Sequence, residues 1–223
     1  MRRPLTLLFA CLVLTLAACG DDGAEPSPAA TPEDTGGEQV SGCTPAERPA
    51  PKDARFARPK QRLQPGKTYV ATMTTSCGTF EITLDAKRAP KTGDSFKFLA
   101  DEGFYDGLGF HRISPGFVIQ GGDPKGDGSG GPGYSIVERP PAKVKYSKGI
   151  VAMAKTGLDR AGTSGSQFFV LTADADDLPP DYALLGKITA GQQVVDLIGI
   201  APVGADEQPV EPIVIESVEV AAR

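Results

Sequence analysis

Glycine and proline divide the chain from Thr68 onward into short segments, and this division limits the fold more than any other feature of the sequence. The segments are apolar or alternate between apolar and polar residues, and they span 68–75, 79–84, 110–113, 117–120, 134–137, 150–154, 168–172, 184–188 and 213–220. Many short strands at this spacing are typical of a β-barrel or sandwich. Residues 90–102 and 191–198 have helical spacing instead, and a glycine follows each stretch. We expect a mainly β domain at 68–223 whose two helices cover the open ends of a closed sheet.

The first 18 residues are typical of a secretory signal peptide. Arg2 and Arg3 precede an apolar run at residues 5–18, which is short for a membrane span. The run ends in Leu-Ala-Ala-Cys-Gly at residues 16–20, which resembles the lipobox of bacterial lipoproteins. In that family the peptide is cut before the cysteine, whose sulfur then carries a diacylglycerol. We therefore expect an extracytoplasmic protein that is anchored to the cell membrane only through lipid on Cys19; an ordinary signal peptide cut at a small residue is the alternative.

The composition of residues 20–67 indicates a solvated tether. This stretch contains eight Pro and six Gly, and its large apolar residues are Val40, Phe56 and Leu63. So few apolar side chains cannot form a core. We predict that residues 19–67 link the lipid anchor to the domain as a disordered, Pro- and Gly-rich segment. A basic arm at 48–67 that binds a partner is the alternative.

Cysteine usage follows from the predicted compartment. Cys11 leaves with the signal peptide and Cys19 takes the lipid, so Cys43 and Cys77 remain. In an oxidising compartment the simplest outcome is a disulfide between them. Two unpaired thiols are the alternative.

Charge and composition exclude several classes of function. The chain has 23 Lys plus Arg against 28 Asp plus Glu, so no excess positive charge is available to neutralise a nucleic-acid backbone. One histidine and no Cys-x-x-Cys are too few soft ligands for a structural zinc site. A Ser-His-Asp hydrolase would have to use His111, which we interpret as a structural or groove-edge residue and not as a base. We expect no metal, no cofactor and no nucleic-acid partner.

Residues 110–123 read as a strand, a Pro-Gly turn and a second strand. If the loop spans 114–116, residue 112 lies opposite 118 and diagonal to 120. Arg112, Val118 and Gln120 then share one face of the hairpin, where a cation and an amide border an apolar patch.

This stretch, Phe-His-Arg-x-x-x-x-Phe-x-x-Gln-Gly-Gly-Asp, resembles the signature of cyclophilin-type peptidyl-prolyl isomerases. A second block agrees, with Ala-Met-Ala at 152–154 and Gly-Ser-Gln-Phe-Phe-Val at 165–170. Shorter matches lie at 89–92, 103–107 and 185–188, so the likeness covers roughly residues 70–220. Two collinear motifs are far more specific than one.

The resemblance implies an eight-stranded antiparallel barrel capped by two helices, with a substrate groove on its outer face. It assigns the catalytic arginine to Arg112, which Gln120 holds in place. The implied proline pocket consists of Phe117, Val118, Phe169 and Leu178, and the implied polar groove contacts are Gln120, Ala154, Lys155 and Gln167, with Tyr182 where a histidine is usual. The sequence departs from the family at Val118, Lys155 and Asp177, which stand where many members have Met, Asn and Trp.

The implied chemistry needs no nucleophile, metal or proton shuttle. Rotation about an X-Pro bond meets a barrier of about 18–20 kcal/mol because the nitrogen lone pair is delocalised into the carbonyl. An apolar cleft penalises the planar amide, and a guanidinium favours the pyramidal nitrogen of the twisted one. We expect a monomeric isomerase that acts on Pro-containing polypeptides and assists folding of exported or envelope proteins. A cyclophilin-like module that binds Pro-containing peptides without turnover is the alternative.

Overall fold

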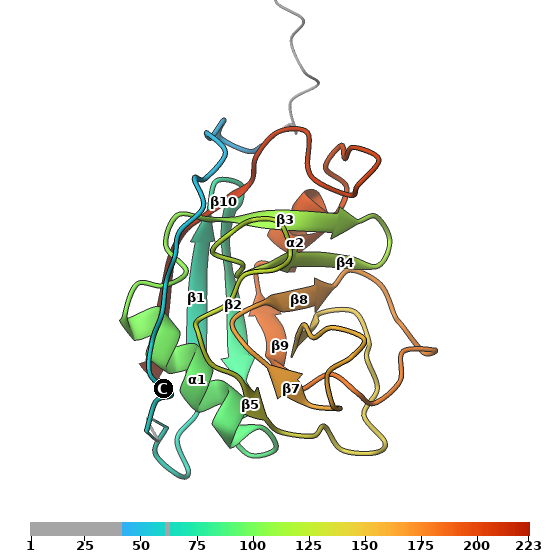
Figure 1. Ribbon diagram of the computed structural model, residues 1–223. Helices are drawn as coiled ribbons and strands as arrows, with labels where there is room; N and C mark the ends of the chain where they lie inside the picture. Colours follow the sequence, from blue (N-terminus) through green and yellow to red (C-terminus); the bar gives the residue numbers. More distant parts are fainter. Residues whose placement is uncertain (1–41, 61–62) are drawn as a thin grey trace, which may run out of the picture. The chain divides into compact units, whose positions relative to one another are not determined.

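The computed structural model describes residues 42–60 and 63–223, and most of its strands form one closed barrel (Figure 1). The barrel strands are β1 (Tyr69–Thr75), β2 (Gly78–Leu84), β3 (Leu108–Ser114), β4 (Val118–Gly121), β6 (Ile150–Met153), β8 (Phe168–Leu171), β9 (Leu184–Ala190) and β10 (Val214–Ala222). They are ordered β1-β10-β3-β4-β8-β6-β9-β2, and every neighbouring pair is antiparallel. The predicted eight-stranded antiparallel barrel is confirmed.

Strand periodicity explains why the barrel interior is filled. Successive side chains of a strand point to opposite faces, so β2 turns Phe80 and Ile82 inward while Glu81 between them is partly exposed. Ile113 of β3 and Ile119 of β4 are fully buried in the same core. Because these side chains occupy the interior, a binding site for a polypeptide has to lie on the outside of the barrel.

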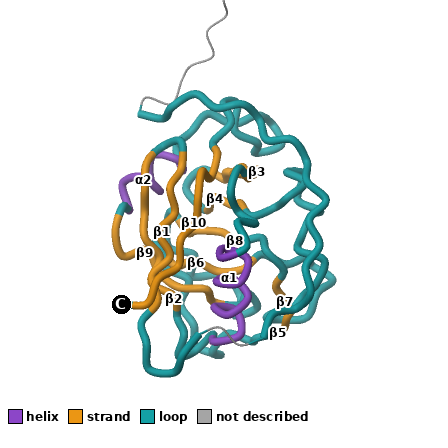
Figure 2. Tube along the Cα trace, turned by 90° about the vertical axis from the view of Figure 1, so that its left-hand side faces the viewer, coloured by secondary structure: helices purple, strands orange, loops and turns teal. Residues whose placement is uncertain are grey.

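The described segments also contain a small second sheet. It pairs β5 (Ile136–Val137) with β7 (Thr163–Ser164), and it lies apart from β1, β2, β9 and β10 in Figure 2. The predicted strand at 134–137 therefore exists in part but does not join the barrel. The pattern of the sequence did not indicate β7, because a strand of two residues has no measurable alternation.

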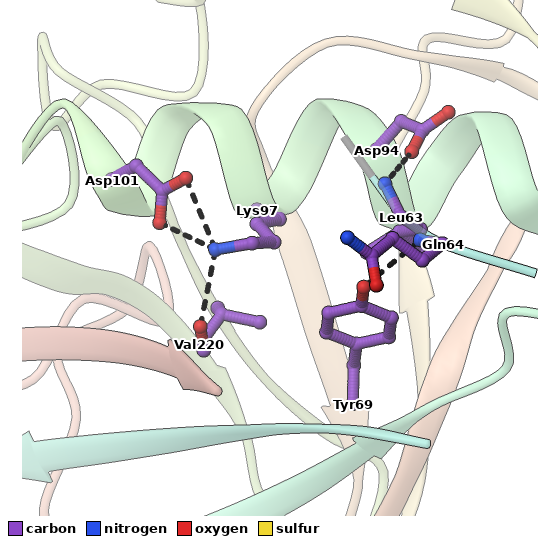
Figure 3. Close-up of polar contacts among 7 residues, drawn as sticks. All are labelled: Leu63, Gln64, Tyr69, Asp94, Lys97, Asp101 and Val220. Carbon is purple, nitrogen blue, oxygen red and sulfur yellow. Dashed lines mark hydrogen bonds and ion pairs between the residues drawn. The ribbon is translucent and has the colours of Figure 1, made fainter. Parts of the chain in front are cut away.

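Within the described residues, two helices complete the core. The first, α1 (Pro90–Asp101), begins with proline, whose missing N–H is not needed in the first turn, and buries Phe96 and Leu99. The second, α2 (Gln192–Gly199), buries Val195 and Ile198. All four side chains belong to the same buried cluster as the barrel interior, which agrees with the predicted helices at 90–102 and 191–198. Lys97 fixes α1 to β10, since its Nζ reaches both Asp101 and the carbonyl oxygen of Val220 (Figure 3).

Residues 42–60, which we call the N-terminal strap, differ from the prediction. A disulfide joins Cys43 to Cys77, and the backbone N–H of Thr44 donates to the carbonyl oxygen of Ser76 at 2.7 Å. The ring of Phe56 packs edge-on against Phe98 and Phe104, with 5.9 Å between centroids in each case. The disulfide agrees with the predicted pairing of the two cysteines, whereas the packing of Phe56 differs from what a disordered tether would show.

The chain remains attached to the domain beyond the strap. Leu63 is 4% exposed, and its N–H donates to Asp94 on α1 at 2.7 Å. The N–H of Gln64 donates to the hydroxyl of Tyr69 at 2.9 Å (Figure 3). Composition failed here because it counts apolar residues without showing that Phe56 and Leu63 each pack against the core cluster beside α1. The predicted signal peptide at 1–18, Cys19 and the tether up to residue 41 lie outside the described residues.

Within the ranges that the structure describes, we find no helix that is both long and apolar enough to cross a membrane.

Candidate active site

The β3–β4 hairpin places Arg112 directly opposite Gln120. The predicted register, with residue 112 opposite 118, is wrong by two residues. Pro115 and Gly116 occupy the centre of a turn in which the N–H of Phe117 donates to the carbonyl oxygen of Ser114 at 3.0 Å, so β4 begins one residue later than predicted. Gly116 has a φ of 73°, which suits glycine at this position of a type II turn. A shift of two preserves strand parity, so Arg112, Val118 and Gln120 still share one face.

An apolar cluster separate from the interior core lies beside this polar pair. Its buried members include Val118 of β4 and Phe169 of β8, which pairs with Gln120 across the sheet. The implied proline-pocket and groove residues gather here: Phe117, Val118, Ala154, Phe169, Leu178 and Tyr182. The structure thus brings together apolar side chains from two strands and three connecting segments on one surface.

Tyrosine side chains fix one wall of the apolar cluster. The ring of Tyr182 stands edge-on to Phe169, with 5.4 Å between centroids. The hydroxyl of Tyr146 donates to the carbonyl oxygen of Tyr182 at 2.7 Å and accepts from its N–H at 3.1 Å. Burial raises the pKa of Tyr146 to about 12, so this hydroxyl keeps its proton and can make both bonds.

A row of side-chain amides continues from Arg112 along the outer face. An Nη1–H of Arg112 donates to Gln120 at 3.3 Å, and the amide of Gln120 donates to Gln167 at 3.0 Å. Gln167 in turn donates to the carbonyl oxygens of Gly128 and Gly130 at 2.9 Å. Gln120 and Gln167 line a cleft of about 240 Å³. The row therefore leads from the cation to a recess suited to a polar segment of a bound chain.

Lys155 lies between this cleft and the apolar cluster. Its Nζ donates to the carbonyl oxygens of Thr156 and Asp159 and lies 5.5 Å from the centre of the Tyr182 ring. A cation at this distance over an aromatic face is attracted by the electrons of the ring. Ala154 and Lys155 both line the cleft.

The sequence did not point to Glu207. Its carboxylate lies against Arg112, with 2.6 Å between Oε2 and Nε, and its Oε1 accepts from the hydroxyl of Ser114 at 2.6 Å. The hydrogen bonds from Ser114 and Arg112 lower the pKa of Glu207, so the carboxylate is ionised at neutral pH. Because 95 residues separate Glu207 from Arg112 in the sequence, no local motif could have linked them.

His111 lies at a shift in the β3–β4 register and is 8% exposed. Among the described residues neither ring nitrogen has a hydrogen-bond partner. Burial lowers its pKa, so the ring is neutral at neutral pH and does not contribute charge to the site. Across residues 42–60 and 63–223 we also find no group of three or more His, Cys, Asp or Glu side chains that could hold a metal ion.

The geometry combines a hydrogen-bond-donating cation with an apolar surface. Arg112 keeps N–H groups beyond those bound by Glu207 and Gln120, since a guanidinium has five. The apolar cluster beside it can take a small apolar ring, and the amide row can bind backbone groups. This arrangement can bind an amide bond next to an apolar ring. It can favour a less dipolar, twisted form of that amide without making or breaking a covalent bond.

Comparison with known proteins agrees with this geometry. The family model described as "Cyclophilin type peptidyl-prolyl cis-trans isomerase/CLD" matches residues 70–220. The chain is 35% identical over 168 residues to a probable peptidyl-prolyl cis-trans isomerase A of Mycobacterium leprae, covering 67% of this chain and 91% of that protein. It is 44% identical over 135 residues to a peptidyl-prolyl cis-trans isomerase of Helicobacter pylori, covering 59% of this chain and 81% of that protein.

A solved structure shows the same fold. The crystal structure of a Cryptosporidium parvum cyclophilin-type peptidyl-prolyl cis-trans isomerase superposes with a TM-score of 0.65 at 30% identity, covering 70% of this chain and 99% of that one. The same protein in the presence of the dipeptide Ala-Pro gives a TM-score of 0.64, with coverages of 69% and 99%. Because the family match extends over most of the chain, this protein belongs to the cyclophilin-type peptidyl-prolyl cis-trans isomerases.

Proposed function

We propose that the chain rotates X-Pro bonds on the outer face of the barrel, with Arg112 as the catalytic residue and the apolar cluster around Phe169 as the proline pocket. One observation carries this assignment: Gln120 contacts Arg112 and is also the strand partner of Phe169. Arg112 on β3 and Phe169 on β8 are therefore separated by one residue, Gln120 on the intervening strand β4. A prolyl ring seated against Phe169 brings its own amide to the guanidinium.

The proposed reaction depends on the change in the amide as it twists. The planar amide is strongly dipolar, and an apolar cluster solvates it poorly. At the twisted transition state the lone pair is localised on nitrogen, and an N–H of Arg112 donates to it. Arginine suits this role because it stays protonated beside apolar surface. Each tenfold increase in rate requires about 1.4 kcal/mol of such preferential stabilisation.

Exchange spectroscopy on an X-Pro peptide tests the assignment without a coupled protease. Cis and trans signals of the peptide exchange slowly alone and are expected to exchange faster with the protein. Arg112→Ala is expected to lower the rate by at least about tenfold, a loss of one charged hydrogen bond. Arg139→Ala is the matched control, since Arg139 is exposed and lies outside the site. Equal rates for Arg112→Ala and the unmodified protein would reject the catalytic role.

We further propose that the protein acts outside the cytoplasm on exported or envelope proteins, held at the membrane by lipid on Cys19. The lipobox-like residues 16–20 support this location. The disulfide between Cys43 and Cys77 also supports it, because disulfides persist in oxidising compartments. Proline-containing polypeptides in that compartment are the proposed substrates.

Fractionation and labelling test the proposed location. The protein expressed with its own leader is expected to incorporate a radiolabelled fatty acid and to sediment with membranes. Cys19→Ser removes the only sulfur that the leader motif offers for lipid and is expected to abolish both results. A Cys19→Ser protein that still carries the label would contradict lipidation at this residue.

A further inference from the structure

Glu207 occupies a position that ties the proposed catalytic arginine to a loop far away in the sequence. One carboxylate oxygen accepts from Nε of Arg112 and the other from the hydroxyl of Ser114, both at 2.6 Å. Arg112 and Ser114 lie two residues apart on β3 and therefore on the same face of that strand. The carboxylate thus bridges two neighbouring side chains on the face that carries the site.

The backbone of the loop holds this carboxylate in place. The N–H of Ile113 donates to the carbonyl oxygen of Glu207 at 2.7 Å, so residue 207 is bound to β3 by main chain as well as side chain. The N–H of Gly204 donates to the carbonyl oxygen of Gln208 at 2.8 Å, and Val203 pairs with Pro209. These bonds close the loop into a tight turn with Glu207 near its tip.

Glu207 has an unfavourable backbone conformation. Its φ is 62°, and among the described residues it is the one non-glycine residue with a positive φ. A left-handed conformation is costly for a residue with a Cβ, and glycine adopts it freely. An exposed ion pair contributes little to stability, and Arg112 and Glu207 are each more than one-third exposed. Global stability therefore gives no reason for a glutamate here, whereas strained residues that persist are commonly tied to function.

Two hydrogen bonds hold the guanidinium group of Arg112 at two different nitrogens. Glu207 accepts from Nε, and Gln120 accepts from Nη1. The remaining N–H groups are on Nη1 and Nη2. Two fixed acceptors at different nitrogens define the plane of the guanidinium, which a single contact to Gln120 could not do.

We propose that Glu207 is a positioning residue for isomerisation, whose carboxylate holds the Nε edge of Arg112 so that the Nη groups face the prolyl amide. This inference rests on the proposed catalytic role of Arg112. Glu207 does not touch the substrate. It acts by raising the fraction of time that the guanidinium spends in the productive orientation. Because orientation matters at the transition state, its removal lowers kcat and leaves KM unchanged.

Two substitutions separate this role from a structural one. Glu207→Gly removes the carboxylate and relieves the backbone strain, while Glu207→Gln keeps the length of the side chain and removes the charge. Without the carboxylate at Nε, one or two side-chain torsions of Arg112 become free, and each has about three staggered wells. If one well of each torsion is productive, kcat is expected to fall about three- to tenfold in the glycine variant. Glu211→Gln is the matched control, because it makes the same charge change in the same connecting segment. Rates come from the exchange assay over a range of peptide concentrations, with urea unfolding of each variant.

The proposal is supported by a lower kcat in Glu207→Gly with unchanged KM and a stability no lower than that of the unmodified protein. It is overturned if Glu207→Gly keeps its kcat, or turns over faster, while Arg112→Ala shows its expected loss of rate. If Arg112→Ala keeps full activity, the proposed function of the site fails first and this inference fails with it.

Discussion

Loss of the disulfide between Cys43 and Cys77 is expected to destabilise the protein substantially. The two cysteines are 34 residues apart. Cross-linking a loop of this length lowers the entropy of the unfolded chain, and the chain-entropy relation gives about 4 kcal/mol at 25 °C. For a domain of this size, each kcal/mol shifts the melting temperature by about 2–4 °C. The double variant Cys43→Ala/Cys77→Ala is therefore expected to melt about 8–15 °C lower.

The strap contacts determine whether this figure applies to the whole domain. If the strap unfolds together with the barrel, the entropy that the disulfide removes from the unfolded chain contributes fully to the free energy of unfolding. The packing of Phe56 against Phe98 and Phe104 and the burial of Leu63 favour one cooperative unit. Isomerase activity is expected to stay unchanged, since neither cysteine lies in the proposed site.

Urea unfolding followed by far-UV circular dichroism and tyrosine fluorescence measures the effect; the chain has five Tyr and no Trp. The unmodified protein treated with reductant should match the double variant, and reductant should not change the double variant. A loss below about 1 kcal/mol would refute the reasoning, because it would mean that the strap detaches before the barrel unfolds.

Three further perturbations have defined outcomes. Phe169→Ala is expected to raise KM at least about tenfold and to lower the free energy of unfolding by about 3–5 kcal/mol, since it empties the proposed proline pocket; peptide titration with an unchanged KM would contradict that pocket. Burial lowers the pKa of His111, so the unfolded chain takes up the proton first and stability should fall by up to about 1.4 kcal/mol per pH unit as the pH drops below about 6.5. His111→Gln should lose that part of the slope in urea unfolding at several pH values, and identical slopes would show that other groups cause it. Gly122→Ala would place a Cβ 2.5 Å from the carbonyl oxygen of Ser166, so this variant should unfold far more easily than the control Gly126→Ala. Gly126 has a similar positive φ, but a Cβ there would have no atom within 4 Å. Equal stabilities of the two variants would argue against the close approach at Gly122.

Strand patterning predicted most of the barrel strands because alternation is local and repetitive. Closure is not local, since it pairs β1 with β10 at the other end of the domain, and the eight-stranded barrel was implied by the family resemblance. Side-chain alternation marks each long strand, and glycine and proline mark the connections. The sequence predicted the shared face of Arg112 and Gln120 but not their register. Parity depends only on counting residues, whereas register depends on which residues the Pro-Gly turn excludes from pairing.

Two features could not be predicted, for different reasons. The disulfide of the strap was predicted, but the strap has too few apolar residues to suggest that Phe56 would pack against Phe98 and Phe104. Glu207 is an acidic residue in a connecting segment, and such residues are usually solvated. Only the three-dimensional path of that segment across β3 brings it to Arg112.

Closure of the barrel has a consequence for how client chains are recognised. Each of the eight barrel strands already has a hydrogen-bonded neighbour on both sides, so the described barrel has no edge strand to which a visiting polypeptide could add. In the proposed site its main chain would meet the amide side chains of Gln120 and Gln167, and its side chains would follow no imposed strand register. An enzyme constructed in this way can act on clients that have little in common except an accessible proline.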